Sequence, residues 1–200
     1  MYLNKIISGV QYSGQKAYAE IKRKYEIPRL PEYFLHLLQT ADSLEIPTEK
    51  LPRMGILYVS HLGPMGQIVH FMNDLMDYTP DQVSPKYFSH GVFNAPTAYL
   101  SRYLGCHGPA LSLCGFSRII ESSIRTAASW LATGSCENIL LIFSDEDIPF
   151  SQEISSMTGL QRFLPTHALW LSSEPDAPNA KQITADDLIQ QITVINQQEQ

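Results

Sequence analysis

The clearest structural pattern of this sequence lies in residues 87–146, which read YFSHGVFNAPTAYLSRYLGCHGPALSLCGFSRIIESSIRTAASWLATGSCENILLIFSDE. The run NILLIFS at 138–144 is apolar without polar alternation, which is typical of a strand buried on both faces. A shorter apolar run, ALSLC at 110–114, predicts a second strand. Residues 117–132 predict a long helix that ends before Gly134, a residue type favoured just after a helix. The apolar face of this helix contains Ile120, Ile124, Ala127, Ala128 and Leu131.

Strand and helix patterns continue toward the N-terminus. Residues 54–60, MGILYVS, predict a strand, and residues 67–76 predict a helix. The apolar face of that helix contains Ile68, Phe71, Met72 and Leu75. We expect residues 83–91, VSPKYFSHG, to form a loop. The other expected elements are a strand at 2–7 and helices at 15–25, 31–46 and 95–104. This alternation predicts a layered α/β domain in which helices cover a sheet.

The C-terminal part is more polar than the rest. Residues 167–172, HALWLS, predict the last strand. The segment ADDLIQQITVI at 185–195 predicts a short amphipathic helix within an otherwise loose end. We therefore divide the chain into a domain at 1–172 and a polar, partly loose C-terminal tail at 173–200.

The composition limits the classes of protein to which the chain can belong. Hydrophobic residues make up 44% and charged residues 17%, which excludes intrinsic disorder over most of the 200 residues. With 14 Lys and Arg against 20 Asp and Glu, the net charge of −6 argues against sequence-independent nucleic-acid binding. No apolar run approaches the roughly 20 residues of a membrane span. The N-terminus lacks the pattern of a signal peptide, so we expect a cytoplasmic protein.

The cysteines and histidines predict no metal, cofactor or disulfide framework. Cys106, Cys114 and Cys136 are an odd number in a chain large enough to fold without disulfides. Cys106 and His107 are adjacent but lack a second pair at metal-ligand spacing. The histidines stand singly, and we expect ordinary core or surface roles for them.

The order of features in residues 87–146 resembles the N-terminal half of β-ketoacyl synthases, which have the thiolase-like fold. In that family an Asn-led helix runs to a Gly-Pro pair, a strand leads to the nucleophilic cysteine, and a long helix ends at a glycine. Here Asn94, Gly108-Pro109 and Gly134 match these positions without a gap. The resemblance implies a thiolase-like half, with the sheet covered by helices.

The nucleophile position of the family falls on Ser117, counted either from Gly108-Pro109 or back from Gly134. Cys114 lies three residues earlier. A nucleophile there would benefit from the helix N-terminus, which lowers the pKa of a thiol, but a serine needs a base to activate it. Ser117 equally fits a helix N-cap, and Cys114 equally fits a buried structural thiol.

The family's condensing members carry a second half that supplies two histidines, in HGTG-like and NxFGFGG-like segments. Neither segment occurs in this sequence. Claisen condensation needs those groups to activate the extender and to stabilise its enolate. We therefore expect that this polypeptide alone is not a working ketosynthase.

Three further features have two interpretations each. The resemblance implies that Asn94 helps to shape an acyl pocket near a dimer interface, and a local cap or turn role competes with this. The acids Asp145, Glu146 and Asp147 predict a solvated turn rather than an acid/base pair, because adjacent strand residues point to opposite faces. The basic run KAYAEIKRK at 16–24 fits either a docking patch for an acidic acyl carrier protein or a solvated helix face.

The resemblance and its departures support two main functions. The first is a ketosynthase-like auxiliary subunit, non-catalytic by itself, in fatty-acid or type II polyketide biosynthesis, aryl-polyene-type pathways included. It would pair with a full-length ketosynthase on acyl-carrier-bound chains, as chain-length factors do, although a homodimer is also compatible. The alternative is a small acyltransferase or thioesterase-like enzyme with Ser117 or Cys114 as acyl acceptor. A diverged remnant with a structural role is a third option.

Overall fold

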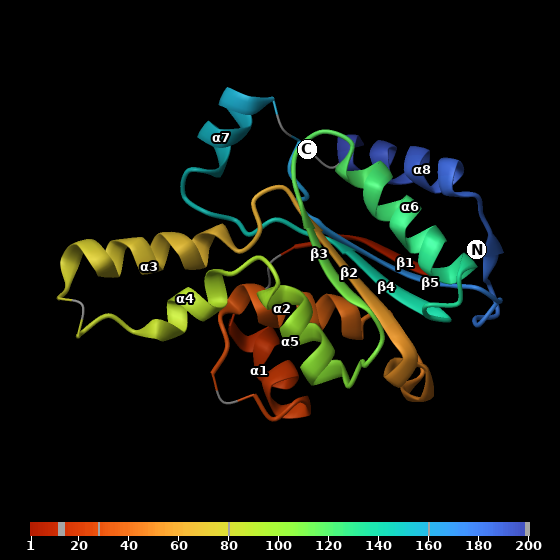
Figure 1. The fold of residues 1–200 in the computed structure, drawn as a ribbon, viewed down its shortest axis with the longest axis horizontal. Coiled ribbons are helices and arrows are strands. Elements are labelled where there is room, and N and C mark those ends of the chain that lie inside the picture. The colour runs from red at the N-terminus through yellow and green to blue at the C-terminus, as the bar shows by residue number, and fades with distance from the viewer. Residues whose placement is uncertain (12–14, 28, 80, 160, 199–200) are drawn as a thin grey trace.

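A six-stranded mixed sheet forms the centre of the structure (Figure 1). The structure is a computed structural model that describes residues 1–11, 15–27, 29–79, 81–159 and 161–198. The strand order is β3-β2-β4-β5-β1-β6. The strands are β1 (Tyr2–Val10), β2 (Met54–Ser60), β3 (Ala110–Cys114), β4 (Asn138–Phe143), β5 (Thr166–Ser172) and β6 (Lys181–Gln182). The predicted strands at 54–60 and 110–114 are thus confirmed at both ends.

The three strands on one side of the sheet are parallel. Strand β2 pairs with β3 and with β4 in parallel, whereas β5 runs antiparallel to both β4 and β1. Ser60 lies opposite Cys114, and Val59 lies opposite Phe143. The carboxyl ends of β2, β3 and β4 therefore meet at one edge of the sheet. Strands β2 and β4 are buried along their whole length, as the unbroken apolar run at 138–144 predicts.

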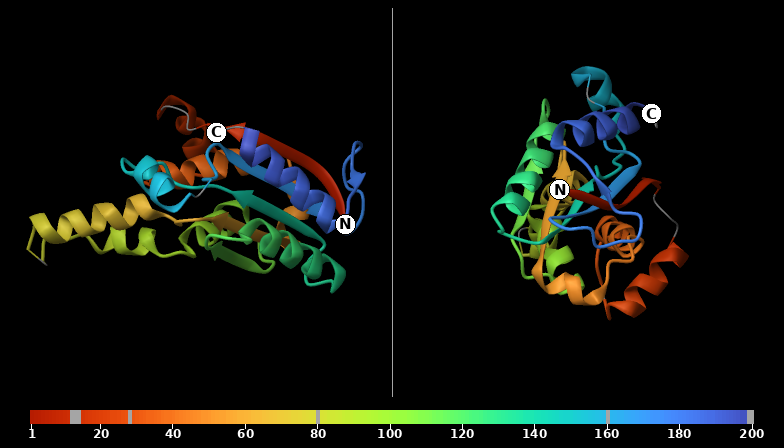
Figure 2. Two further views of the ribbon diagram at one scale, coloured as in Figure 1. Left: turned by 90° about the horizontal axis from the view of Figure 1, so that it is seen from above. Right: turned by 90° about the vertical axis from the view of Figure 1, so that its right-hand side faces the viewer.

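Two layers of helices cover the two faces of the sheet (Figure 2). Helices α1 (Gln15–Lys24), α2 (Glu32–Asp42) and α5 (Ala95–Leu104) pack on one face, where α2 buries most of its side chains. Helices α6 (Ile119–Ala132) and α8 (Ala185–Gln198) cover the other face. The α/β class and the sheet covered by helices are confirmed.

Helix α6 confirms the predicted long helix but begins two residues later than expected. Its buried side chains include Ile124, Ala127 and Leu131. After the helix, Gly134 has a φ of +71°, and its N–H donates to the carbonyl of Leu131. Because left-handed backbone favours glycine, this residue ends the helix where the sequence predicts.

An arm of two helices projects from the layered body (Figures 1 and 2). It consists of α3 (Met65–Asp77) and α4 (Pro85–Gly91), which pack on each other. The prediction of a loop at 83–91 is wrong, because Ser84 caps the helix and Pro85 fits its first turn. The expected apolar face of α3 is present, but Met72 and Leu75 are about half exposed rather than buried in the core.

Residues 173–198 contain elements that pack on the body. Strand β6 pairs with β1, and α8 packs against α6 with Leu188 and Ile192 buried. This confirms the helix expected at 185–195, while the domain boundary at residue 172 stays a prediction. The remaining elements are a 3-10 helix, η1 (Thr48–Arg53), and α7 (Ser151–Thr158). Within the described ranges, no helix has the length and apolar character needed to cross a bilayer.

Candidate functional site

A cleft of about 470 Å³ lies at the carboxyl ends of the parallel strands. We call it the strand-end cleft. Its lining residues come from the ends of β2 and β3 and from the segments that follow or face them: His61, Leu62, Met65, Phe93, Ser112, Cys114, Gly115 and Phe116. In open α/β sheets, ligands bind outside the carboxyl ends of strands, so this cleft is the natural place for a functional site.

Asp145, directly after β4, organises one wall of this region. Its side chain is fully buried, and its Oδ1 accepts hydrogen bonds from Ser60 Oγ at 2.5 Å and from the His61 N–H at 2.8 Å. Its Oδ2 accepts from the Phe163 N–H at 2.8 Å and lies 2.9 Å from His61 Nδ1. A buried carboxylate with this many donors is fixed in position and ties the end of β2 to the segment before β5.

His61 is held from two sides. Its Nδ1 bonds Asp145, and its ring stacks on Phe163 with centroids 4.3 Å apart. A base oriented by a buried carboxylate supplies two of the three members of a nucleophile–base–acid triad. Burial acts to raise the pKa of Asp145, but hydrogen bonding and charge from His61, with the hydrogen bond from Ser60, lower it overall. The carboxyl group is therefore ionised at neutral pH.

Cys114 lines the same cleft as His61, so the structure brings this predicted site residue into one cleft with a base. The residue has exposed surface although its thiol is partly buried, and it is not in a disulfide. Burial of the group, and then the negative charge of Asp145, raise the pKa of Cys114 to about 11. The group is therefore a neutral thiol at neutral pH, and any acyl transfer to it needs a base.

Ser117 lies in the exposed turn between β3 and α6. The N-cap position of α6 belongs to Arg118, with a φ of +61°, so the expected N-cap role of Ser117 is wrong. Ser117 is not among the residues that line the strand-end cleft, although its neighbour Phe116 is. The catalytic roles of Ser117 and Cys114 stay predictions.

Asn94 occupies the N-cap position of α5, and its side chain makes no capping hydrogen bond. Its backbone carbonyl accepts from Thr97 Oγ1 at 2.9 Å and from the Ala98 N–H at 3.0 Å. The side chain is exposed, and the preceding Phe93 lines the cleft instead. The pocket-shaping role of Asn94 stays a prediction.

The pair His61 and Asp145 is the feature that the sequence argument missed. The solvated turn expected at 145–147 is wrong for Asp145, which has no exposed surface. Adjacent acids do point to different sites, since Glu146 bonds Gly66 and Gln67 rather than His61. One signal was available in the sequence: His61 follows the predicted strand at 54–60, and Asp145 follows the predicted strand at 138–144. The carboxyl ends of parallel strands meet at one edge of a sheet.

No metal site joins these groups. In the part of the chain that the structure describes, no cluster of three His, Cys, Asp or Glu side chains has the arrangement of metal ligands.

The family described as beta-ketoacyl synthase, N-terminal domain, matches residues 36–199. This match confirms the resemblance inferred from residues 87–146. No curated protein sequence matches the chain.

Solved structures of ketosynthases share the fold at low sequence identity. A ketosynthase (ApeO) in complex with its chain length factor (ApeC) from Xenorhabdus doucetiae has a TM-score of 0.51 at 16% identity, over 88% of this chain and 78% of that chain. A β-ketoacyl synthase from Burkholderia phymatum has a TM-score of 0.59 at 13% identity, over 83% and 46%.

A type II polyketide synthase acyl carrier protein in complex with its ketosynthase, AntDE:AntF, has a TM-score of 0.59 at 17% identity, over 83% of this chain and 51% of that chain. The chain thus spans about half the length of the last two structures. The fold is that of one thiolase-like half.

Proposed function

This chain belongs to the family of β-ketoacyl synthase N-terminal domains, and from that premise we propose that it is a ketosynthase-like auxiliary subunit, non-catalytic by itself. It pairs with a full-length ketosynthase that extends acyl-carrier-bound chains in the cytoplasm. The pathway class is fatty-acid or type II polyketide biosynthesis, aryl-polyene-type pathways included. Two structural neighbours, a ketosynthase with its chain length factor and a ketosynthase with its carrier protein, support this class.

The observation that carries the proposal is the open edge of the sheet at β3. Strand β3 pairs with β2 on one side, and the described residues place no strand on its other side. Leu111 on this strand is 37% exposed, and Phe93 and Phe116 nearby are more than half exposed. An open strand edge next to exposed aromatic side chains is a template for pairing with another chain.

The non-catalytic part of the proposal rests on the nucleophile position. Ser117 occupies the place of the family's cysteine, and it lies in an exposed turn outside the cleft that contains His61. The sequence also lacks the histidine-bearing segments that the family uses for condensation. A subunit of this kind shapes and stabilises the complex while its partner performs the chemistry.

Co-purification from the native host tests the proposal. A C-terminal tag on the chain should recover a full-length ketosynthase in stoichiometric amount, identified by mass spectrometry. Leu111→Lys should abolish this recovery, because it places a charge on the edge strand. The matched control is Val194→Lys, which changes an apolar residue that is 48% exposed on α8. The proposal fails if the wild-type chain is recovered without a ketosynthase.

A second candidate function is acyl transfer through Cys114, and the shared cleft with His61 favours it over transfer through Ser117. In this reaction His61 would take the thiol proton while the sulfur of Cys114 attacks an acyl thioester, which leaves an acylated cysteine and a released thiol. Incubation with an acyl thioester should then give an adduct by intact-mass analysis. Cys114→Ala should give no adduct, His61→Gln should form it more slowly, and Ser117→Ala should form it as the wild-type chain does. Absence of any adduct in the wild-type chain excludes this function.

A further inference from the structure

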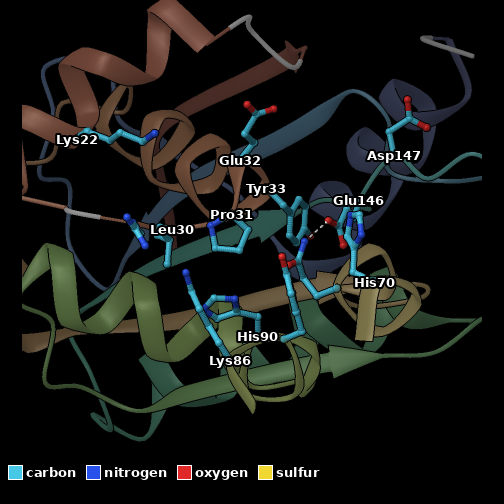
Figure 3. A pocket seen from close by; sticks show the side chains of 13 residues that line it. Lys22, Leu30, Pro31, Glu32, Tyr33, His70, Lys86, His90, Glu146 and Asp147 are labelled. Carbon is cyan, nitrogen blue, oxygen red and sulfur yellow. Dashed lines mark hydrogen bonds between the residues drawn. The ribbon is translucent and has the colours of Figure 1, made fainter. Parts of the chain in front are cut away.

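A second cavity, larger than the strand-end cleft, lies between the segment that leads into α2 and the arm formed by α3 and α4. Its volume is about 680 Å³, which is within the usual range of small-molecule sites. We call it the basic cavity, because Lys22 of α1, Arg29 before α2 and Lys86 of α4 all line it. Figure 3 shows it from close by.

The three cations of the basic cavity are not neutralised by partners. In the described part of the chain, Lys22, Arg29 and Lys86 make no ion pair. Many other cations of the chain do, as Lys24 at the end of α1 does with Asp42. Three unpaired cations around one cavity, in a chain of net charge −6, point to an anionic ligand.

His90 adds a buried polar side chain to the lining of the cavity. The residue is 3% exposed, it lines the cavity, and its Nδ1 has no hydrogen-bond partner among the described residues. Its ring is packed edge-on against Phe34 and Tyr99, which fixes its orientation. A buried polar atom without a partner costs free energy, but Nδ1 has almost no accessible surface, so any contact with a ligand is made by the other edge of the ring.

Two of the three carboxylates that line the cavity stand apart from this cationic side. In Figure 3, Lys22, Lys86 and His90 lie on one side, and Glu146 and Asp147 lie on the other. Glu146 is already satisfied, since its two oxygens accept from the Gly66 N–H and from Gln67 Nε2, both at 2.8 Å. Its burial also raises its pKa.

The third lining carboxylate is that of Glu32 at the start of α2, which is exposed to solvent. Lys22, Arg29 and Lys86 are exposed as well, so water screens these cations and this carboxylate alike. Asp147 is exposed as well, and it lies 3.7 Å from Arg162. The formal charges of the lining residues therefore balance, and attraction for an anion is confined to the side of the cavity where Lys22 and Lys86 lie.

We propose that the basic cavity binds a small organic phosphate, with the phosphate held by Lys22, Arg29, Lys86 and His90. Phosphate suits this set because it accepts several charge-assisted hydrogen bonds from different directions. The cavity is much larger than a phosphate ion, and Leu30, Pro31 and Tyr33 supply walls for an organic part of the ligand. The site is separate from the strand-end cleft, so the proposal does not depend on the auxiliary-subunit function.

Phenyl phosphate is a suitable first probe, because it joins a phosphate to a flat apolar group. Titration calorimetry of the purified chain, with any bound partner retained, should give a dissociation constant of about 1 mM or below in 150 mM salt. Inorganic phosphate should bind several-fold more weakly, because it does not reach the apolar walls. Absence of binding by phenyl phosphate at ten times that concentration overturns the proposal.

The variants separate a built site from general attraction by charge. Lys86→Ala changes an exposed residue and should weaken phenyl phosphate binding roughly tenfold, the value of one charge-assisted hydrogen bond. Lys24→Ala removes the same charge from α1 outside the cavity and should leave binding unchanged. Equal weakening by both variants would show that the anion is attracted by charge alone, and the assignment of the site would be wrong. His90→Gln should weaken binding as well, with an unchanged melting temperature as the check on folding.

Discussion

Replacement of Asp145 tests the account of the strand-end region most directly. Asp145→Asn keeps the shape of the side chain but replaces one acceptor oxygen by an NH₂ donor. If the amide nitrogen takes the place of Oδ2, it faces the Phe163 N–H, which cannot become an acceptor. If it takes the place of Oδ1, it faces the His61 N–H instead. Either orientation leaves a buried N–H without an acceptor.

The expected loss of stability follows from the hydrogen bonds that the substitution removes. One buried donor left unsatisfied, together with the loss of charge-assisted bonds from the Ser60 and His61 side chains, should lower the free energy of unfolding by about 2–3 kcal/mol. Asp145→Ala removes every acceptor and should cost about 3–5 kcal/mol. These are large parts of a typical stability of about 5–15 kcal/mol.

Urea unfolding at pH 7, followed by circular dichroism, measures these values. The control is Asp147→Asn, whose carboxylate is 68% exposed and has one contact at 3.7 Å with Arg162. That variant should change stability by less than about 0.5 kcal/mol. A cost below about 1 kcal/mol for Asp145→Asn, with an unchanged slope against urea, would refute the argument that Asp145 ties the two segments together.

The pH dependence of the same variant is a second check. The pKa of Asp145 is lower in the folded state than its ordinary value of 3.8. The stability that this group contributes is thus present above that value and is lost as the pH falls below it toward the folded pKa. Asp145→Asn should remove this contribution to the loss of stability in acid. The difference in free energy of unfolding between wild type and variant should therefore become smaller at acidic pH.

Three further predictions concern the two cavities and the core. Burial raises the pKa of Glu146 in the folded state, so wild-type stability should fall as the pH rises from 4.5, the ordinary pKa of a glutamate, through the raised pKa. Glu146→Gln should abolish this fall in urea titrations from pH 4 to 8. Parallel pH profiles of the two proteins would contradict this prediction. With a pKa of about 11, Cys114 should react slowly with iodoacetamide, at a rate that rises about tenfold per pH unit from pH 7 to 9, whereas fast labelling independent of pH would indicate a thiolate. Ile124→Ala on the buried face of α6 should cost about 2–5 kcal/mol, against under about 0.5 kcal/mol for Ser129→Ala at an exposed position of the same helix. Equal effects would show that α6 does not pack as described.

The sequence alone determined most of the elements and the class of fold. The apolar run at 138–144 and the helical spacing from Ile120 to Leu131 are local patterns, and local patterns fix which face of a strand or helix is buried. The same patterns, with Gly108-Pro109 and Gly134 at their spacing, were enough to identify the resemblance to ketosynthases. The helix at 85–91 was missed because a serine followed by a proline marks a helix start as well as a turn.

The tertiary structure alone decided where the polar groups meet. His61 and Asp145 are 84 residues apart, and they bond because β2 and β4 are neighbours in a parallel sheet, which no local pattern states. The exposure of Met72 on α3 has the same origin, since an apolar face predicts that something covers it but does not name what. Periodicity is set by each residue and its near neighbours in the chain, whereas a site depends on the order of the strands, which results from packing of the whole chain.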